Sequence, residues 1–228
     1  DNDMENVLTW EVEKGDAVNS EDGLTSGAAN GVVKASPEKV MKWIWDFSSP
    51  ERRRTHVKED IARDVLTRNS DHSITIYHKT WFPSPLHARY YFLRQVWKRF
   101  DDSKICFVIY DDTSAFNRPE FGLARQASDA VQASLNAFIL LELVDSNQVE
   151  QELVSNLEEN TSNTAKGSDW TKITHFCSYN LQGKMPVSLV KRTLNSALHL
   201  IGEIQESFNN EQHDESIDVE ADAISANN

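Results

Sequence analysis

Residues 185–208 read MPVSLVKRTLNSALHLIGEIQESF, and this stretch is the strongest indicator of the fold. Pro186 suits the first turn of a helix, because its missing N–H would have no partner there. Apolar side chains then recur every three or four residues, at Val187, Val190, Leu194, Ala197, Leu198, Ile201, Ile204 and Phe208. This spacing predicts one long helix over 186–208 with a single apolar face.

The segments before this helix are predicted strands joined by short turns. Strand-like runs occupy 88–100, 104–112, 129–144 and 170–180, and two more flank the turn residues at 69–71. Short turns favour antiparallel pairing, and a curled sheet would bury the apolar face of the helix. We therefore predict an α+β fold in which a curved antiparallel β-sheet wraps around a long C-terminal α-helix.

Residues 31–47, GVVKASPEKVMKWIWDF, predict a short strand followed by a helix. Ser36 suits the N-cap, and Pro37 suits the first helical position. One apolar face follows at helical spacing, formed by Val40, Trp43, Ile44 and Phe47. Residues 48–57 predict a second, shorter helical segment.

Alternation of charged and uncharged residues indicates which side of each strand faces inward. In the strand at 90–98, one alternating set contains Arg94 and Lys98, whereas the other contains no charge. Lys104 and Lys172 mark the outward sets of two later strands in the same way. The predicted inward set is Tyr91, Leu93, Gln95, Trp97, Ile105, Phe107, Ile109, Ile173, His175, Cys177 and Tyr179.

The polar members of that inward set leave two interpretations open. Tyr91, Gln95, His175 and Tyr179 each need a hydrogen-bond partner if they are buried. An apolar wall with a few polar groups is the usual composition of a small-molecule cavity. A packed core whose tyrosine hydroxyls reach its edge would give the same pattern.

Acidic residues are concentrated in three segments that are poor in aromatic residues. Residues 1–30, 145–168 and 209–228 hold 19 of the 36 acidic residues and two of the 23 basic residues. The rest of the chain therefore carries 17 acidic and 21 basic residues, so the net charge of −13 belongs to these segments. We expect one domain at 31–208, an acidic surface insertion at 145–168 and a disordered acidic tail at 209–228. Residues 1–30 are expected to be partly flexible, although they could include a first strand.

Several functional classes have no signal in the sequence. No run approaches the ~20 apolar residues of a membrane-spanning helix, and no signal peptide opens the chain. The histidines lack metal-ligand spacing, and no nucleophile motif or phosphate loop occurs, so we expect no cofactor, metal or catalytic residue. The acidic segments argue against nucleic acid as a partner. Cys106 and Cys177 are predicted to be buried, reduced thiols in a cytoplasmic protein.

Three stretches resemble the StAR-related lipid-transfer (START) domain, a helix-grip fold in the birch-pollen-allergen and polyketide-cyclase superfamily. Residues 31–47 resemble its strand and helix. Residues 82–99, FPSPLHARYYFLRQVWKR, resemble its proline loop and the Arg-Asp-Phe-Val strand, with Arg89 and Tyr91 at the Arg and Phe positions. Residues 171–186, TKITHFCSYNLQGKMP, resemble its strand that ends in Asp-Leu-x-Gly-x-x-Pro.

The chain also departs from the family pattern at identifiable positions. Tyr90 and Asn180 each stand where the family usually has Asp, whereas Leu181, Gly183 and Pro186 match. The N-terminal helix of the family is not evident in 1–30, and the segment at 145–168 has no counterpart. These motifs are structural, so they bear on the fold more directly than on the ligand.

The resemblance implies non-enzymatic binding or transfer of one lipid or other hydrophobic molecule between the sheet and the C-terminal helix, in a module of a larger protein. It places a mouth loop that could contact a membrane at Trp81, Phe82, Pro83 and Pro85. The candidate ligand contacts are Tyr77, Tyr91, Leu93, Gln95, Trp97, Phe107, His175, Tyr179, Leu194, Leu198 and Ile201. We expect a monomer that is cytoplasmic and peripheral at membranes.

Two other functions stay open at this point. One is a cavity enzyme of the cyclase or hydrolase kind, which would use His175 with Tyr91 or Tyr179 as an acid–base pair. The other is a regulatory domain with a collapsed cavity, whose acidic tails bind a basic partner. The basic run at 51–54, with Lys191 and Arg192, could contact anionic headgroups, although such runs are more often solvated surface.

Overall fold

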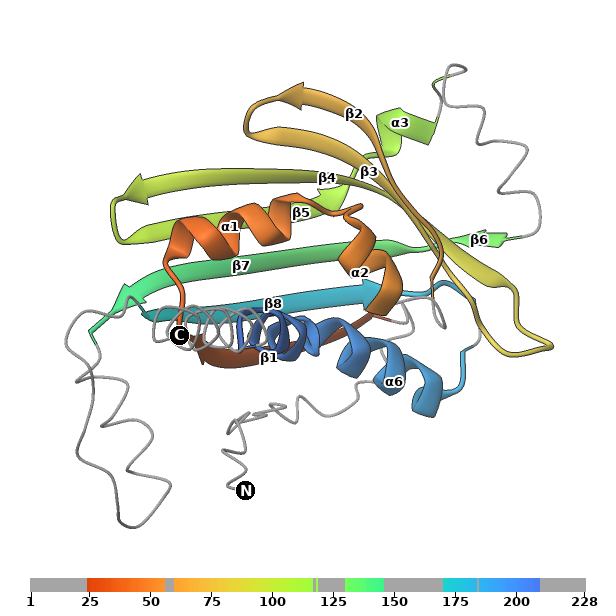
Figure 1. The fold of residues 1–228 in the computed structure, drawn as a ribbon. Helices are drawn as coiled ribbons and strands as arrows, with labels where there is room; N and C mark the ends of the chain where they lie inside the picture. Colours follow the sequence, from red (N-terminus) through yellow and green to blue (C-terminus); the bar gives the residue numbers. More distant parts are fainter. Residues whose placement is uncertain are drawn as a thin grey trace, which may run out of the picture.

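A curved sheet with helices against its inner face makes up the described structure (Figure 1). The computed structural model describes residues 24–55, 60–116, 118, 130–145, 170–183 and 185–209. Apart from residues 145 and 209, the acidic insertion at 145–168 and the acidic tail lie outside the described residues, and so does the segment 1–23.

In the described part of the chain, eight strands form one sheet in the order β1-β8-β7-β5-β4-β3-β2, with β6 beside β4. Every neighbouring pair is antiparallel except β4 and β6. The predicted antiparallel sheet is therefore confirmed. The strands are β1 (Leu24–Val33), β2 (Asp60–Ser70), β3 (Ser73–Thr80), β4 (Ala88–Asp101), β5 (Lys104–Asp111), β6 (Ala130–Gln132), β7 (Ser134–Val144) and β8 (Trp170–Asn180).

The first strand begins earlier than the sequence predicts. Residues 24–30 were expected in a partly flexible segment, yet all of β1 pairs with β8, from Leu24 opposite Asn180 onward. Small residues explain the difference. A Cβ on Gly27 would lie 3.0 Å from a methyl carbon of Leu194, and a Cβ on Gly31 would overlap a methyl group of Ile201. A run that looks like a flexible linker is therefore a strand shaped for close approach of a helix.

The helices of the described residues are α1 (Pro37–Trp45), α2 (Pro50–Thr55), α3 (Thr113–Phe116) and α6 (Val187–Leu198). The side chain of Ser36 accepts a hydrogen bond from the backbone N–H of Lys39 at 3.4 Å, so the predicted N-cap of α1 is confirmed. After α6 the chain makes a turn at His199, and residues 200–209 are helical again. Hydrogen bonds from His199 N to Asn195 O (2.9 Å) and from Glu203 N to His199 O (3.1 Å) continue across the turn. The predicted long helix therefore consists of two consecutive helical segments.

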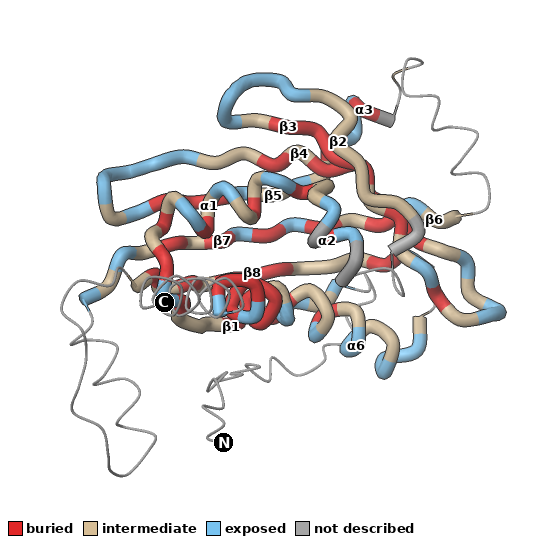
Figure 2. Tube along the Cα trace, viewed as in Figure 1, coloured by how far each residue is buried: buried red, intermediate tan, exposed pale blue. Residues whose placement is uncertain are grey.

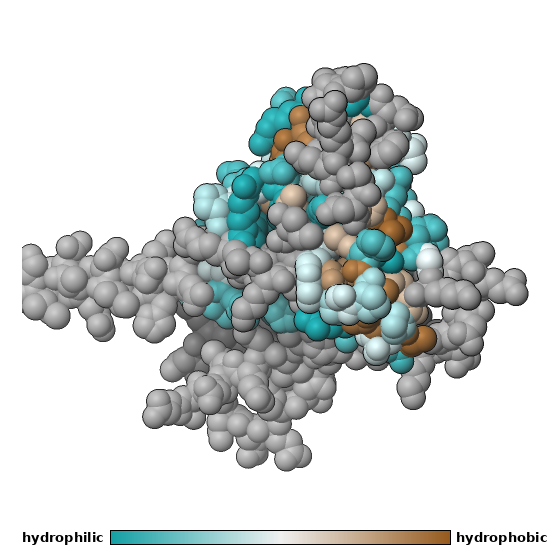
Figure 3. All heavy atoms as spheres, turned by 90° about the vertical axis from the view of Figure 1, so that its right-hand side faces the viewer, coloured by the Kyte–Doolittle hydropathy of each residue, from teal (hydrophilic) through white to brown (hydrophobic). Residues whose placement is uncertain are grey.

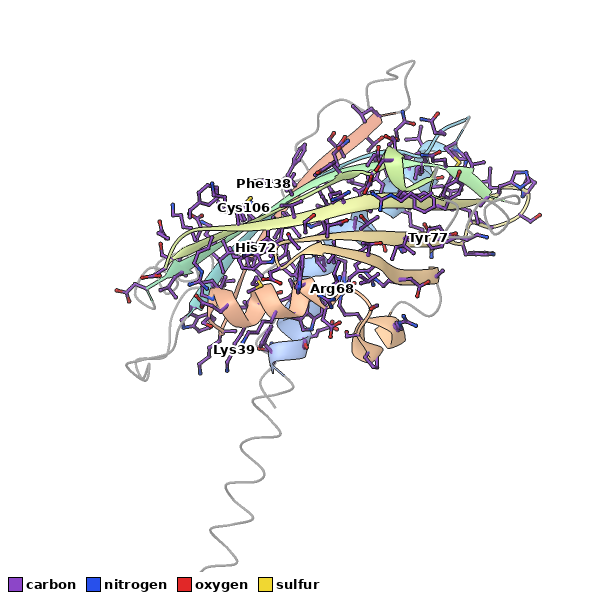
Figure 4. All side chains as sticks on the ribbon, turned by 90° about the horizontal axis from the view of Figure 1, so that it is seen from above. Lys39, Arg68, His72, Tyr77, Cys106 and Phe138 are labelled. Carbon is purple, nitrogen blue, oxygen red and sulfur yellow. The ribbon has the colours of Figure 1, made fainter. Side chains whose placement is uncertain are left out.

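Burial follows the predicted alternation on β8, and Figure 2 shows where buried and exposed residues lie on the sheet. His175 and Cys177 are buried, whereas Phe176 between them is 44% exposed. On β4 the outward residues Tyr90 and Phe92 are buried as well, because they form a second cluster with Tyr77 and Ala115. Figure 4 shows the labelled Phe138 on the side of the sheet away from α1. Each face of the sheet therefore carries its own apolar cluster, and the larger one lies beneath the helices.

Candidate functional site: a cavity beneath the C-terminal helix

A cavity of about 270 Å³ lies between the inner face of the sheet and the helices. Strands β3, β4, β5, β7 and β8 supply most of its wall: Ile76, His78, Thr80, Tyr91, Leu93, Gln95, Ile109, Leu135, Ala137, Ile139, His175, Cys177 and Tyr179. The helices, the link between α1 and α2, and the residues that follow α6 supply Ile44, Phe47, Arg52, Leu189, Arg192, Thr193, Ser196, Ala197, Leu200 and Glu203. The sequence left a cavity and a filled core equally open, and the structure contains a cavity.

Five predicted ligand contacts line this cavity together, namely Tyr91, Leu93, Gln95, His175 and Tyr179. Three residues of the predicted mouth loop, Trp81, Phe82 and Pro83, line it as well. They come from β4, from β8 and from the loop between β3 and β4. The sheet is curved enough for Tyr91 and Tyr179 to meet edge to face, with ring centroids 6.1 Å apart.

The other predicted contacts lie elsewhere in the molecule. Tyr77 belongs to the second cluster, on the outer face of the sheet. Trp97 packs against Trp45 and His72 (6.4 and 4.2 Å between ring centroids), away from the cavity.

Four further candidates also lie outside the cavity wall, and so does Pro85 of the mouth loop. Phe107 is fully buried in the main core. Leu194, Leu198 and Ile201 are on the side of the helix that packs against the glycines of β1.

The cavity-facing side of α6 was not foreseen from the sequence. The apolar stripe of the helix packs against β1, and a neighbouring stripe faces the cavity instead. That second stripe also repeats every three or four residues, at Leu189, Thr193, Ser196, Leu200 and Glu203. Its mixed polar and apolar composition, adjacent to the apolar stripe, is the signal that could have identified it.

His175 is a deeply buried titratable side chain on the strand side of the cavity. It is 4% exposed, and desolvation lowers the pKa of its imidazole from 6.5 to about 4. Its Nδ1 atom has no hydrogen-bond partner among the described residues. The ring is therefore neutral at physiological pH and has unused hydrogen-bonding capacity.

Positive charge gathers where α1 ends. Arg52 donates a hydrogen bond to the carbonyl oxygen of Ile44 at 3.0 Å, and Gln95 donates to the same oxygen at 3.4 Å. The guanidinium carbons of Arg52 and Arg63 lie 5.6 and 4.4 Å from the ring centroid of Phe47. Carbonyl groups at a helix C-terminus attract cations, so Arg52 stabilises the end of α1 as well as lining the cavity.

Arg89, at the Arg position of the family motif, connects the mouth loop to the turn before α6. Its guanidinium donates hydrogen bonds to the carbonyl oxygens of Leu181 and Gln182, and it lies 5.5 Å from the ring centroid of Phe82. Burial lowers the pKa of Arg89. This residue therefore holds both sides of the cavity mouth in place.

The turn between β8 and α6 has a defined conformation. The side-chain oxygen of Asn180 accepts a hydrogen bond from the backbone N–H of Gln182 at 3.0 Å. Gln182 and Gly183 both have positive φ angles, 57° and 74°. An Asp carboxylate would accept the same bond, so either Asn or Asp at position 180 can hold this turn.

Apolar side chains are exposed beside the mouth. Trp81 is 56% exposed and Val187, at the start of α6, is 54% exposed. Figure 3 views this side of the molecule and shows apolar residues gathered among polar ones. Among the described residues, no helix is long and apolar enough to cross a membrane, and no cluster of His, Cys, Asp or Glu could hold a metal ion.

Comparison with known proteins identifies the fold. No family model matches the sequence, and no curated protein matches it. Solved structures do match, at low sequence identity. The human StarD13 (DLC2) lipid transfer and protein localization domain has a TM-score of 0.56 and 16% identity, over 84% of this chain and 80% of that chain.

Two further solved structures are similar in fold to this chain. Human STARD10 has a TM-score of 0.57 and 14% identity, over 90% of this chain and 71% of that chain. The STAR-related lipid transfer protein of Xanthomonas axonopodis (fragment 25–204) has a TM-score of 0.55 and 13% identity, over 81% of this chain and 85% of that chain. The chain therefore has the helix-grip fold of START domains, and the predicted fold class is confirmed.

Proposed function

We propose that this chain binds one lipid or other hydrophobic molecule in the cavity and carries it without changing it chemically. The observation that supports this most directly is a cavity of about 270 Å³ with a largely apolar wall, beneath a helix. Filling it with apolar surface gains roughly 25 cal/mol for each Å² removed from water. The similarity in fold to structures described as lipid-transfer proteins points the same way.

The buried histidine favours a carrier over a cavity enzyme. An acid–base catalyst works best when its pKa lies near the operating pH. The pKa of His175 is about 4, so its imidazole is a weak base at neutral pH. The thiol of Cys177, which also lines the cavity, has its pKa raised to about 12 and is a poor nucleophile.

Exchange of the ligand requires the mouth to open between the loop at 81–87 and α6. The first half of the helix is held loosely, because only Leu194 and Leu198 are buried in α6. Residues 201–205 are all buried, so the second half anchors the helix. Local opening of the first half would expose the cavity without unfolding the domain.

Contact with a membrane surface would aid this exchange. Trp81 and Val187 lie beside the mouth, and tryptophan favours the interface between water and lipid.

The experiment is recovery of lipid from the purified chain. The full chain is incubated with vesicles made from a total lipid extract, separated from them, and extracted for lipid mass spectrometry. We expect one lipid class enriched over its share of the vesicles, at up to one molecule per chain.

The matched control is Ala137→Phe. Ala137 is 7% exposed and lines the cavity from β7, so a phenyl group there would occupy the space of the ligand. This variant should fold, as shown by circular dichroism, and recover no lipid. Equal amounts of lipid from the wild type and from the variant would contradict the proposal.

A further inference from the structure

His175 offers a hydrogen bond that the described part of the protein does not use. The side chain is 4% exposed and lines the cavity, and its Nδ1 atom has no partner among the described residues. Buried nitrogen atoms of this kind are rare in native proteins, because leaving one unpaired costs its lost hydration. Because the side chain lines the cavity, a polar group on a ligand could pair with this imidazole.

The immediate surroundings of His175 are uncharged. On the neighbouring strands, the residues in register with it are Ala29 of β1 and Ile139 of β7. Cys177, two residues along on the same face, keeps its proton because burial raises the pKa of its thiol to about 12. Burial likewise keeps the imidazole neutral. A charged group beside this ring would therefore be buried without a compensating charge.

The charged side chains of the cavity wall belong to other elements. Arg52 and Arg63 lie against Phe47 on the α1 side, and Arg63 comes from β2, the edge strand at the opposite end of the sheet from β1. Arg192 and Glu203 come from the helix that covers the cavity. The remaining titratable groups in the wall are His78, Tyr91 and Tyr179.

The size of the cavity limits the ligand. An apolar cavity of ~150 Å³ holds a benzene molecule, and drug-sized ligands occupy ~300–1,000 Å³. A volume of about 270 Å³ therefore encloses roughly ten to twelve non-hydrogen atoms of a ligand, and a longer ligand would extend through the mouth. Both chains of a phospholipid would not fit within it.

From these observations we propose that the cavity is selective for an uncharged amphiphile whose hydroxyl group hydrogen-bonds to the imidazole of His175. A hydroxyl group can donate or accept, so it suits either tautomer of the neutral imidazole. The aromatic side chains Tyr91, Tyr179 and Phe47 would contact the apolar body of the ligand. This inference rests on the proposed function and adds the chemical class of the ligand to it.

The test uses three probes that share one ring system: 2-naphthol, 2-methylnaphthalene and 2-naphthoate. The first two have the same shape and differ in one hydroxyl group, whereas the third carries a negative charge. Their dissociation constants for the full chain are measured by fluorescence titration at pH 7. We expect 2-naphthol to bind roughly five- to tenfold more tightly than 2-methylnaphthalene, as one neutral hydrogen bond allows. 2-Naphthoate should bind more weakly than 2-naphthol.

Three variants test whether the preference for 2-naphthol over 2-methylnaphthalene depends on His175. In His175→Leu the two uncharged probes should bind with equal affinity. The preference for 2-naphthol over 2-methylnaphthalene comes from the interaction of its hydroxyl group with the imidazole, which this variant lacks. His175→Gln restores a hydrogen-bonding group and should recover part of the preference. Tyr179→Phe is the matched control, since it removes a different polar atom from the same wall and should leave the preference unchanged.

The outcomes separate the two proposals. If the wild type recovers lipid from vesicles but binds none of the probes, this inference fails and the proposed function stands; if it does neither, both fail. If 2-naphthol and 2-methylnaphthalene bind with equal affinity, or the preference survives in His175→Leu, the inference alone is overturned. Tighter binding of 2-naphthoate than of 2-naphthol would also overturn it, because the cavity would then select an anion.

Discussion

At the scale of single residues, the chain buries several polar groups whose partners differ in kind. Arg89 finds backbone carbonyl groups, and Gln95 shares the carbonyl oxygen of Ile44 with Arg52. His175 has an Nδ1 atom without a partner among the described residues. Buried polar groups with partners hold a fold in place, whereas one without a partner needs an explanation, and a ligand in the cavity would supply it.

His175 should make stability depend on pH in a defined window. Its pKa falls from 6.5 to about 4 on folding, so the unfolded chain binds more protons between these values. The stability due to the neutral ring is complete above pH 6.5 and is lost as the pH falls toward 4, by about 3 kcal/mol in total. Urea unfolding at several pH values measures this loss. Between pH 6.5 and 4, the free energy of unfolding of His175→Leu should fall by about 3 kcal/mol less than that of the wild type. If it falls equally in both proteins, His175 is not the source of the pH dependence.

Replacing Arg89 should destabilise the domain. Arg89→Met removes charge-assisted hydrogen bonds to the carbonyl groups of Leu181 and Gln182, so we expect a loss of about 2–3 kcal/mol in the free energy of unfolding. Arg53→Met is the control, because the Arg53–Asp64 ion pair (3.2 Å) is about half exposed and should contribute less than ~1 kcal/mol. Equal effects of the two substitutions would show that Arg89 does not hold the mouth.

Alternation in the sequence correctly predicted the inward direction of Tyr91, Gln95 and His175. It could not predict that Tyr90 and Phe92 are buried too, because the cluster on the outer face depends on residues that are distant in sequence, such as Ala115. It also could not assign Leu194 and Leu198 to β1 rather than to the cavity. Periodicity identifies the face of a helix, but the partner of that face is a property of the tertiary structure.

At the scale of elements, the position of the C-terminal helix depends on the glycines of β1. Gly27 and Gly31 leave room for Leu194 and Ile201 on the inner face of the strand. This close packing places the apolar stripe of the helix on β1 and turns its mixed stripe toward the cavity. The sequence predicted the helix but only the end of the strand, from residue 31, because glycine and alanine have low strand propensity.

Adding a methyl group at Gly31 should disturb this packing. A Cβ there would overlap the buried side chain of Ile201, so we expect Gly31→Ala to cost about 1–3 kcal/mol. Gly27→Ala meets side-chain methyl carbons of Leu194 and Leu198 at 3.0 and 3.1 Å, which are less severe contacts, and it should cost less. Chemical denaturation of the two variants tests this order, and the reverse order would contradict the packing described here.

The two halves of the C-terminal helix should differ in local stability. Backbone amides in α6 are expected to exchange with solvent faster than those of residues 201–208, because α6 has fewer buried side chains. Hydrogen exchange read by mass spectrometry resolves the two segments. Saturating 2-naphthol should slow exchange in α6 more than in residues 201–208, and equal protection of both segments would argue against opening at α6.

At the scale of the whole molecule, the charge pattern and the fold are consistent with each other. The three acidic segments carry more than half of the acidic residues, and the described structure is formed largely by the mildly basic remainder. The resemblance to START domains in three short stretches predicted the helix-grip fold, which the structure confirms. A cavity could not be predicted over a filled core, because both have the same alternating pattern.

A bound ligand should stabilise the whole domain. At a free ligand concentration 100 times the dissociation constant, binding to the folded state adds about 2.7 kcal/mol. For a chain of this size that gain corresponds to a rise in Tm of roughly 5–10 °C. Thermal unfolding with and without 2-naphthol measures the shift, and Ala137→Phe should show none. A similar rise in that variant would place the binding outside the cavity.

The most direct test of the central claim is native mass spectrometry of the chain after incubation with a total lipid extract. A cavity that holds one hydrophobic molecule predicts a discrete one-to-one adduct, whose mass gives the class of ligand and which is absent from Ala137→Phe. A mass equal to that of the chain alone, with no adduct from any lipid class, would contradict the claim that this domain is a carrier.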